Sequence, residues 1–543
     1  MTQQPKPGSP LVFTARPWPA FRSLLRRPKL VLALLVLLVA GYGYAMLVPA
    51  VDMDDLAIAT YQQGGEFLRQ GRFTVWLLQA LTGIMEYQRF WPELFASVCL
   101  ALAGVLLSAI FYTAARLPAR SPGTLLLAGG LLLWPYHAEI LMYSNQCGVG
   151  LGYLLCALAL GFAAPHLAGT GRRGLPGATG AAVLLTFALG LYESFAPVWL
   201  TLVFGLLLVQ EAFSAPARRT PGQLLAAMVR GLWPLAAALV LRAGVSAALC
   251  ALLGVSGEDG TASKTIFWFR RDSLRDALVI PLREWLDNYL ARAFGVPALS
   301  LLAIACVALV VWLVLHRRGV LCGVLLLLSQ FSLGLLQGTG SQMARASQCF
   351  AVFVPLVAWL WLAAGLDAPR RPRPGGKSWL CYALAALLLL AEWASLGDIF
   401  RYNRDRWAYE EGILADTADQ LDALDPTGSM PVVFTGEIQL SEALTRRAVI
   451  APGNPAYKAA YLVAAVLGGP QGELYHYENP QTLVINWAQT AFGSHEQMYL
   501  LMEEIGRPCV RPTAEQQAAG DALAGTVPEG SVSAQDGYLL VCF

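Results

Sequence analysis

Three aspartates, Asp52, Asp54 and Asp55, follow closely on the first long apolar segment of the chain. Neighbouring carboxylates suit two chemical tasks. One carboxylate can deprotonate an acceptor hydroxyl as a general base while its neighbour positions the substrate. Alternatively, Asp54 and Asp55 could bind a divalent cation such as Mg²⁺ or Mn²⁺ through hard oxygen ligands. A structural interpretation also stays open, because one of these side chains could cap a helix that begins near Leu56.

Other polar side chains interrupt apolar sequence and could converge with these aspartates. His137 and Glu139 lie at the end of one apolar segment, and Tyr192 and Glu193 lie at a tight turn between two others. Charged groups next to hydrocarbon are costly and tend to mark function. We therefore expect these four residues to contact a substrate, although Glu193 could also be a satisfied polar residue between helices.

Three arginines, Arg270, Arg271 and Arg345, supply positive charge near the same boundary. The planar guanidinium donates two parallel hydrogen bonds and therefore suits a phosphate. The alternative is that these arginines anchor the chain among lipid headgroups.

The segments around these residues are apolar enough to place the chain in a membrane. Hydrophobic residues make up 56% of the sequence and charged residues 14%, and a helix needs about 20 mostly apolar residues to cross the hydrocarbon layer. We expect about eleven transmembrane helices, within a domain that spans residues 30–397. Their predicted ranges are 30–49, 92–114, 122–141, 146–165, 176–194, 196–212, 225–254, 296–316, 319–337, 349–366 and 378–396.

Arginine and lysine cluster on alternate connections between these segments, and cationic loops are retained in the cytoplasm. This pattern predicts a cytoplasmic N-terminal arm, residues 1–29, and an odd number of spans then places residues 398–543 outside. The first span lacks a small-residue cleavage site, so we interpret it as a retained helix. The basic connections contain Arg116 and Arg120, Arg172 and Arg173, Arg218 and Arg219, Arg317 and Arg318, and Arg370, Arg371, Arg373 and Lys377.

Two of the external connections, 50–91 and 256–295, are long and carry apolar residues at helical spacing. This spacing predicts helices that lie in the membrane interface and cover the external mouth of the bundle. The apolar positions are Phe73, Trp76, Leu77, Ala80 and Ile84 in the first connection, and Leu274, Leu278, Leu282, Leu286 and Leu290 in the second.

The composition changes after residue 397, and residues 398–543 are typical of a small extracytoplasmic α/β domain. PVVFTGEI and GYLLVCF predict strands, and HEQMYLLMEEIG predicts a helix. Cys509 and Cys542 both fall in this domain, where an oxidising compartment would permit a disulfide between them. Two free thiols are the alternative.

Charge and motif content exclude several classes of partner. The net charge of +2 is close to neutral and does not favour a nucleic-acid partner. The sequence has no CxxC pair and no HExxH element, which argues against a structural zinc site. Beyond the divalent metal considered at Asp54 and Asp55, the sequence indicates no cofactor.

Several short motifs occur in an order that resembles the Gtr type II bacterial glucosyltransferases, which modify O-antigen. The motifs are the aspartates after the first span, Gly71-Arg72-Phe73, GLYESFAPVWL and the C-terminal VPEGSVSAQDGYLLVCF. The chain departs from the family pattern at three places: no arginine follows soon after the aspartates, Phe73 replaces a common tryptophan, and Glu193 replaces glutamine.

This resemblance implies a GT-C type membrane glycosyltransferase in the bacterial inner membrane. Such enzymes transfer a sugar, here glucose, from a polyprenyl-phosphate carrier to O-antigen or a related surface polysaccharide at the periplasmic face. The expected partners are the lipid-linked donor, the glycan acceptor and membrane lipids. The resemblance implies Asp54 or Asp55 as general base, and it adds Arg72 to Arg270, Arg271 and Arg345 as candidates for the donor phosphate. Inversion or retention of the sugar configuration stays open.

Two other functions are compatible with the same sequence. An O-antigen ligase or polymerase would also need external arginines to hold a carrier lipid. A transporter or flippase of the lipid-linked sugar belongs to a different class, and it would carry matched repeats and polar breaks near the middle of the membrane. The charges here gather at one boundary, which favours an enzyme.

Overall fold

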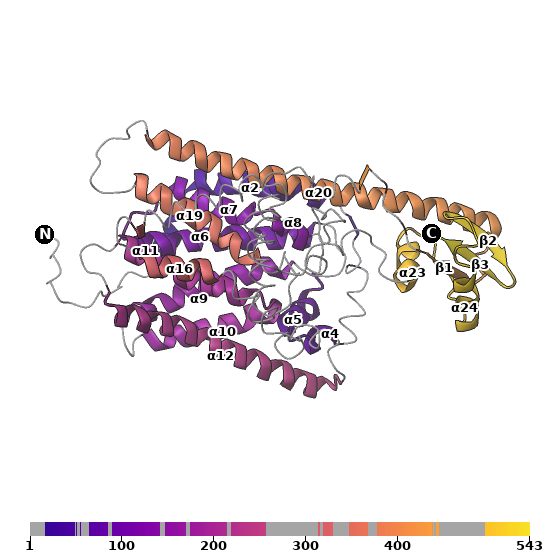
Figure 1. Ribbon diagram of the computed structural model, residues 1–543, viewed down its shortest axis with the longest axis horizontal. Coiled ribbons are helices and arrows are strands. Elements are labelled where there is room, and N and C mark those ends of the chain that lie inside the picture. The colour runs from indigo at the N-terminus through magenta and orange to yellow at the C-terminus, as the bar shows by residue number, and fades with distance from the viewer. Residues whose placement is uncertain are drawn as a thin grey trace, which may run out of the picture.

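The computed structural model describes residues 17–48, 50–51, 55, 65–84, 90–141, 147–169, 174–213, 219–256, 313–314, 319–329, 347–366, 377–436, 438, 441, 443–444 and 495–543. These residues form a bundle of helices and, beyond one end of it, a smaller C-terminal unit with a sheet (Figure 1). The helices of the bundle are α1 (Trp18–Leu25), α2 (Pro28–Leu47), α4 (Glu66–Arg69), α5 (Phe73–Thr82), α6 (Trp91–Ala115), α7 (Ser121–Leu132), α8 (Tyr136–Leu141), α9 (Gly148–Leu167), α10 (Leu175–Leu191), α11 (Phe195–Phe213), α12 (Pro221–Leu253), α16 (Val320–Ser329), the 3₁₀ turn η4 (Ser347–Cys349), α19 (Phe350–Leu366) and α20 (Lys377–Leu424).

Within the described residues, six helices are long and apolar enough to cross a membrane, namely α2, α6, α9, α11, α12 and α20. Apolar side chains on the outer helices are exposed, among them Leu35 on α2, Val240 on α12 and Leu387 on α20. Contiguous exposed apolar surface on a protein needs an apolar partner. The helical bundle is therefore that of a membrane protein.

The described helices correspond closely to the predicted spans. Each predicted span except 296–316 overlaps a helix of the bundle. The span 296–316 lies outside the described residues apart from positions 313 and 314. A helix near Phe73 is confirmed as α5, and its position in the membrane interface stays a prediction. The helix predicted over 274–290 lies outside the described residues.

Small residues allow the inner helices to pack closely. A Cβ atom on Gly104 of α6 would lie 2.5 Å from the Cα atom of Ala128 on α7, and one on Gly150 of α9 would lie 2.3 Å from the carbonyl oxygen of Ala96. Ser108 and Thr124 add a buried hydrogen bond of 2.8 Å between α6 and α7. Small residues and hydroxyl pairs of this kind hold helices together in a membrane, where lipid is as apolar as the side chains.

The predicted span 122–141 is not one helix. The chain forms α7, leaves helical geometry around Trp134 and Pro135, and resumes as α8. Proline has no N–H and its ring clashes with the carbonyl four residues earlier, which here is that of Leu131. Hydrophobicity alone predicts a continuous span because the interrupting residues are themselves apolar.

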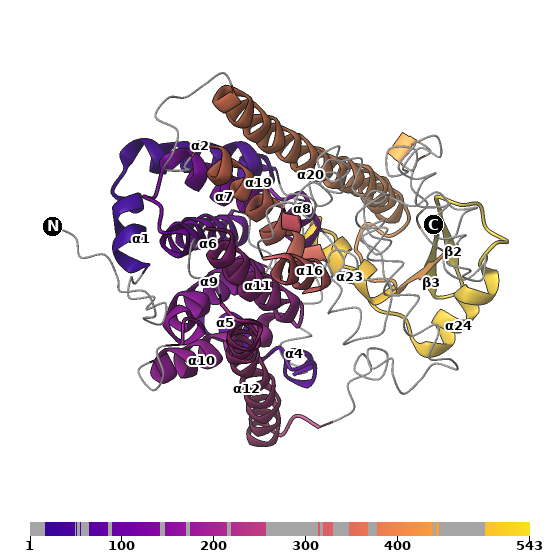
Figure 2. The same ribbon diagram turned by 60° about the vertical axis from the view of Figure 1, so that its left-hand side comes forward.

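The helix α20 contains 48 residues and is about 72 Å long at 1.5 Å per residue. It runs along the side of the bundle opposite α12 and continues into the C-terminal unit (Figure 1), and the turned view agrees (Figure 2). The domain boundary predicted between residues 397 and 398 therefore lies within one continuous helix. The change of composition there marks where the surroundings of the helix become polar.

The C-terminal unit contains a three-stranded sheet in the order β1-β3-β2. Its central strand β3 pairs in parallel with β1 and antiparallel with β2. Gly520 of α24 lies close against β1, because a Cβ there would be 2.4 Å from Val433 Cγ1. The predicted strands and the helix at residue 495 are confirmed, whereas β2 and α24 were not predicted. The elements are β1 (Val432–Thr435), α23 (His495–Glu504), α24 (Ala514–Leu523), β2 (Ser531–Gln535) and β3 (Tyr538–Cys542).

Candidate functional site

The turn between α10 and α11 is the meeting point of several residues singled out in the sequence. The helix α10 ends at Leu191, Tyr192 is extended with φ −160° and ψ 138°, and α11 begins at Phe195. Gly190 lets α5 approach this turn closely, because a Cβ there would lie 2.4 Å from Thr74 Oγ1. The hydroxyl of Thr74 donates to the carbonyl of Phe187 at 2.8 Å and joins the start of α5 to α10.

Arg72 immediately precedes α5 and lies over the ring of Tyr192. Its Cζ atom is 4.5 Å from the ring centroid, a distance at which the aromatic face attracts a cation. Tyr192 is buried, so the ring gives the guanidinium a firm support. The structure thus brings together two of the predicted site residues that are 120 positions apart in the sequence.

Glu193 forms an ion pair with Arg242 of α12, with 3.0 Å between Oε1 and Nη2. The same guanidinium donates to the carbonyl of Gly71 at 3.1 Å and to that of Gln70 at 3.0 Å. Glu193 is therefore the satisfied polar residue between helices that one interpretation of the sequence expected. Arg242 holds the segment before α5 against α10 and α12.

Arg242 was missed in the sequence, although a signal for it exists. It lies in the 33-residue helix α12, whose surroundings in the sequence are almost wholly apolar. An ionisable residue inside such a helix is by itself a reason to expect a functional or structural partner. The partner carbonyls of Gln70 and Gly71 could not be identified without the fold.

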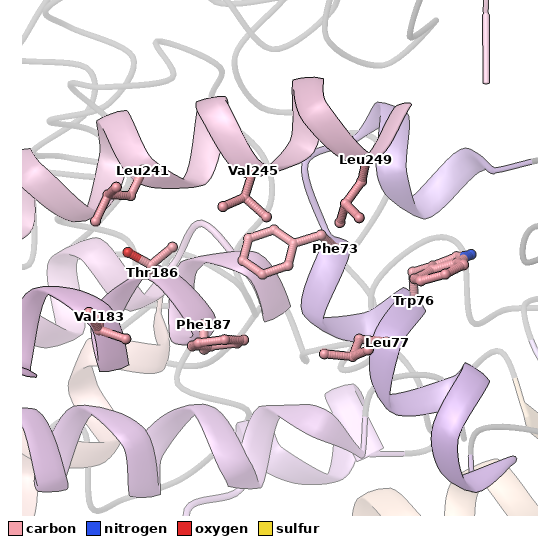
Figure 3. A pocket seen from close by; sticks show the side chains of 9 residues that line it. All are labelled: Phe73, Trp76, Leu77, Val183, Thr186, Phe187, Leu241, Val245 and Leu249. Carbon is pink, nitrogen blue, oxygen red and sulfur yellow. The ribbon is translucent and has the colours of Figure 1, made fainter. Parts of the chain in front are cut away.

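An apolar pocket of about 350 Å³ lies between α5, α10 and α12. Figure 3 shows Phe73 in the middle of it, between Val245 on α12 and Phe187 on α10. The rings of Phe73 and Phe187 meet edge to face, with centroids 5.8 Å apart. Two lining residues, Phe73 and Leu241, directly adjoin Arg72 and Arg242 in the sequence. The lining consists of Phe73, Trp76, Leu77, Val183, Thr186, Phe187, Leu241, Val245 and Leu249.

His137 is buried at the break between α7 and α8, where it has a structural task. Its Nε2 atom lies 2.9 Å from the carbonyl oxygen of Leu131. In a continuous helix this carbonyl would accept from the N–H of residue 135, but Pro135 has no N–H. Since a carbonyl only accepts, Nε2 carries the proton. Tyr42 caps the next carbonyl, that of Leu132, at 2.7 Å. Glu139 belongs to α8, but its side chain lies outside the described part of the structure.

A buried network connects His137 to the same turn. Its ring meets that of Tyr153 edge to face at 5.3 Å, and the Tyr153 ring meets that of Phe195 at the same distance. The Tyr153 hydroxyl donates to the carbonyl of Gln348 at 2.6 Å, and Ser194 donates to the side chain of Gln348. The turn 192–194 is thereby packed against η4, which follows Arg345 in the sequence by two residues.

Of the two aspartates predicted to be catalytic, the structure describes Asp55, which is buried. Asp54, Arg270, Arg271 and Arg345 lie outside the described residues. The described residues contain no group of three or more side chains of the kinds that ligate metals. The divalent metal considered at Asp54 and Asp55 therefore stays a prediction.

Cys509 and Cys542 are both free in the structure, so the predicted disulfide is not formed. The reason lies in the sheet. Cys542 on β3 pairs with Thr435, whereas Val510, next to Cys509, pairs with Pro431 on the other edge of β1. The two Cα atoms are therefore separated by two strand spacings of about 4.8 Å each and by an offset of several residues at roughly 3.3 Å each. A disulfide requires its two Cα atoms to lie about 6 Å apart.

A family model described as "Glucosyl transferase GtrII" matches residues 43–358, which is more than half of the chain. The match runs from the end of α2 to within α19, and it contains the aspartates, Arg72, the turn 192–194 and the pocket. No curated protein and no solved structure matches the chain.

Proposed function

The chain belongs to the GtrII family of glucosyltransferases, and from that premise we propose that it transfers glucose from a polyprenyl-phosphate carrier to O-antigen or a related surface polysaccharide. The transfer would take place at the periplasmic face of a bacterial inner membrane. A glucosyltransferase embedded in a membrane can take its sugar from a donor that is itself a lipid.

The observation that carries this proposal is the apolar pocket whose lining residues Phe73 and Leu241 directly follow Arg72 and directly precede Arg242 in the sequence. A polyprenyl chain needs an apolar channel, and the pocket between α5, α10 and α12 is lined by apolar and aromatic side chains with a single hydroxyl, that of Thr186. That hydroxyl donates back to the carbonyl of Ala182 at 2.8 Å. The pocket thus offers an isoprenoid contact without an unsatisfied polar group.

Arg72 is our candidate for the donor phosphate among the described residues. It adjoins the pocket through Phe73 and rests on the Tyr192 ring at 4.5 Å. A guanidinium that stacks on an aromatic face still directs its N–H groups sideways, in its own plane. A phosphate at the end of a pocket-bound isoprenoid would therefore meet a positioned cation. Arg242 would act indirectly. It binds the carbonyls of Gln70 and Gly71, the two residues that precede Arg72, and would thereby position Arg72.

The acceptor chemistry falls to the aspartates. In the proposed step, the acceptor hydroxyl oxygen forms a bond to the anomeric carbon of glucose, and Asp54 or Asp55 takes the hydroxyl proton. The bond from the anomeric carbon to the phosphate oxygen breaks, and the electron pair leaves with polyprenyl phosphate. The arginine side chains stabilise the charge of that leaving group. Tyr192 would support the phosphate site, and His137 has no contact with substrate in this proposal.

The position of the site along the bundle supports a periplasmic reaction. The helices α4, α5 and α8 lie at the end of the bundle that faces the C-terminal unit (Figure 1). The basic connections that we expect in the cytoplasm do not adjoin these three helices, and they include the connections between α6 and α7 and between α11 and α12. One of them holds Arg219, which pairs with Glu211 at 3.2 Å at the end of α11.

The test is a transfer assay on membranes that contain the full chain, supplied with polyprenyl-phosphate glucose and a short O-antigen acceptor. We expect glucose transfer, and we expect Asp54→Asn or Asp55→Asn to abolish it without changing the amount of protein in the membrane. Transfer that both variants retain would overturn the assignment of the base. Transfer that survives exhaustive chelation would remove the metal-binding role of the aspartates.

The same assay separates the two alternative functions. A ligase or polymerase would move a preassembled glycan and would depend more on Arg345 than on the aspartates. A flippase would move the lipid-linked glucose across the bilayer and leave the acceptor unmodified. The product, analysed by mass, therefore decides among the three.

A further inference from the structure

A fully buried arginine joins α20 to the chain just before the aspartates. Arg406 donates through Nη2 to the carbonyl of Val51 at 2.9 Å, and through Nη1 to Glu410 Oε2 at 2.6 Å. The side chains of Arg406 and Glu410 are both 0% exposed. Asn403 completes the group, because its Oδ1 accepts from Nε of Arg406 at 3.1 Å and from Nη2 at 2.9 Å.

Val51 is also packed into the core of the C-terminal unit. It is 1% exposed and belongs to one apolar cluster with Trp407 and Leu414 of α20 and with Val432 of β1. The residue after Val51 is Asp52, and Asp55 is 3% exposed. The acidic segment therefore follows a residue, Val51, whose position is fixed by α20 and by the core of the C-terminal unit.

Helix stability does not explain why this ion pair is buried. Taking two charges out of water costs more than their attraction returns unless further hydrogen bonds satisfy them. An exposed pair stabilises a helix without this cost, and α20 has one in Arg401 and Asp398, which are 60% and 70% exposed. Among the bonds described for Arg406, the one to Val51 leaves α20, and it fixes a backbone position elsewhere in the chain.

We propose that Arg406 is a positioning residue for the transfer reaction, which sets where the segment Asp52–Asp55 begins by holding the Val51 carbonyl against α20. This inference rests on the proposed function, since it takes the aspartates as the base. It extends the working site to α20, which lies beyond the residues that match the family model.

The geometry requires a guanidinium. Its two terminal nitrogens serve different partners, one on Glu410 and one on Val51 and Asn403. A lysine ammonium is a single point charge on a flexible stem and cannot reproduce this fork. Arg406→Lys therefore retains the charge but loses the fixed distance between α20 and Val51.

The test compares Arg406→Gln and Arg406→Lys with Arg401→Gln, which removes an exposed arginine from the same helix. All variants are assayed as full chains in membranes, with kcat and the donor KM measured separately and normalised to folded protein. We expect Arg406→Gln to lower kcat on the order of 100-fold, because a displacement of about 1 Å can have that effect, with the donor KM unchanged. Arg406→Lys should lower kcat at least about 10-fold, and Arg401→Gln should match the wild type.

The pH profile distinguishes positioning from a loss of folded enzyme. If the aspartate no longer reaches the acceptor hydroxyl, the rate of Arg406→Gln should keep rising with pH where the wild type levels off. A smaller folded fraction would scale the profile without changing its shape, and that result would overturn the proposal. If Arg406→Gln does not accumulate, Arg406→Lys decides by the same two measurements.

The failure of this inference can be told from the failure of the proposed function. If Asp54→Asn and Asp55→Asn retain transfer, the base is misassigned whatever Arg406 does. If they abolish transfer while both Arg406 variants keep the wild-type kcat and pH profile, the positioning role alone is wrong.

Discussion

At the scale of single residues, the described site depends on arginines whose partners come from distant parts of the chain. Arg72 rests on Tyr192, Arg242 joins Glu193 to the backbone of Gln70 and Gly71, and Arg406 holds Val51. The sequence indicated Arg72 and Glu193, because polar residues beside apolar segments are conspicuous. It could not indicate that Glu193 is bound by Arg242, since nothing local relates two residues 49 positions apart.

The role of Arg72 can be tested by substitution. Arg72→Gln should lower kcat/KM for polyprenyl-phosphate glucose on the order of 10- to 100-fold, because a hydrogen bond to a charged group contributes about 1.5–3 kcal/mol. Arg72→Lys should restore part of this loss. Initial rates over a range of donor concentrations measure the effect.

Arg69→Gln is the matched control. Arg69 lies three residues earlier, on α4, and pairs with Glu66 at 2.6 Å. It does not adjoin the pocket lining, and its partner lies within the same short helix. Its replacement should therefore leave the donor KM within about twofold of the wild type, as an ion pair between neighbouring turns of a helix contributes little. Equal losses in the Arg69 and Arg72 variants would show that the assay reports general charge and not a phosphate site.

At the scale of elements, the close approach of α5 to α10 determines whether Arg72 lies over the Tyr192 ring and whether the pocket forms. Gly190 makes this approach possible, since a Cβ there would meet Thr74 Oγ1 at 2.4 Å and Phe73 Cε1 at 2.6 Å. The sequence predicted α10 with nearly correct ends, and the apolar spacing from Phe73 to Ile84 predicted a helix where α5 lies. The contact between them was not predictable, because hydrophobic periodicity indicates which residues face inward but not which helix they face.

Gly190→Ala should push α5 away from α10. The added methyl group must displace Thr74 or Phe73, and overpacking of this kind costs about 1–3 kcal/mol. We expect a higher donor KM and a lower unfolding temperature, measured by transfer kinetics and by thermal unfolding in detergent.

Gly180→Ala, in the same helix, provides the comparison. No atom lies within 4 Å of a Cβ at Gly180, and alanine favours a helix over glycine by roughly 0.5–1 kcal/mol. Unchanged kinetics with equal or higher thermal stability are expected. A wild-type donor KM in Gly190→Ala would contradict the dependence of the site on this close approach.

At the scale of the whole molecule, α20 links the membrane bundle to the C-terminal sheet, and the turn after α20 connects it to β1. The Asp425 carboxylate accepts from the backbone N–H of Met430 at 2.6 Å and from the Thr427 hydroxyl at 2.6 Å. These hydrogen bonds hold the pKa of Asp425 below its usual value. The turn sets the course of the chain from α20 into β1.

The lowered pKa predicts a pH dependence. A carboxyl whose pKa is lower in the folded state adds stability above its unfolded pKa, about 3.9, and loses it as the pH falls through the folded value. Asp425→Asn should therefore lower the unfolding temperature of the C-terminal unit at neutral pH, and the difference from the wild type should shrink below about pH 4. Thermal unfolding of the full chain, followed through the tryptophans, measures this difference.

As a control, Asp416→Asn removes an exposed carboxylate from α20, the helix that precedes Asp425. We expect its unfolding temperature to follow that of the wild type at each pH. A difference for Asp425→Asn that is the same at pH 3 and pH 7 would contradict the assignment.

The sequence by itself determined that this is a helical membrane protein, where most of its spans lie, that its C-terminal part has strands at Val432 and Tyr538, and which family it resembles. These properties follow from hydrophobicity and short motifs, which each segment carries locally. Only the tertiary structure decided that α7 and α8 are separate helices with His137 capping the break, that α20 continues into the C-terminal unit, and that Cys509 and Cys542 lie apart. Those outcomes depend on which distant groups form hydrogen bonds or ion pairs with a buried carbonyl, a buried charge or the edge of a strand. These partners come together only when the segments pack against one another.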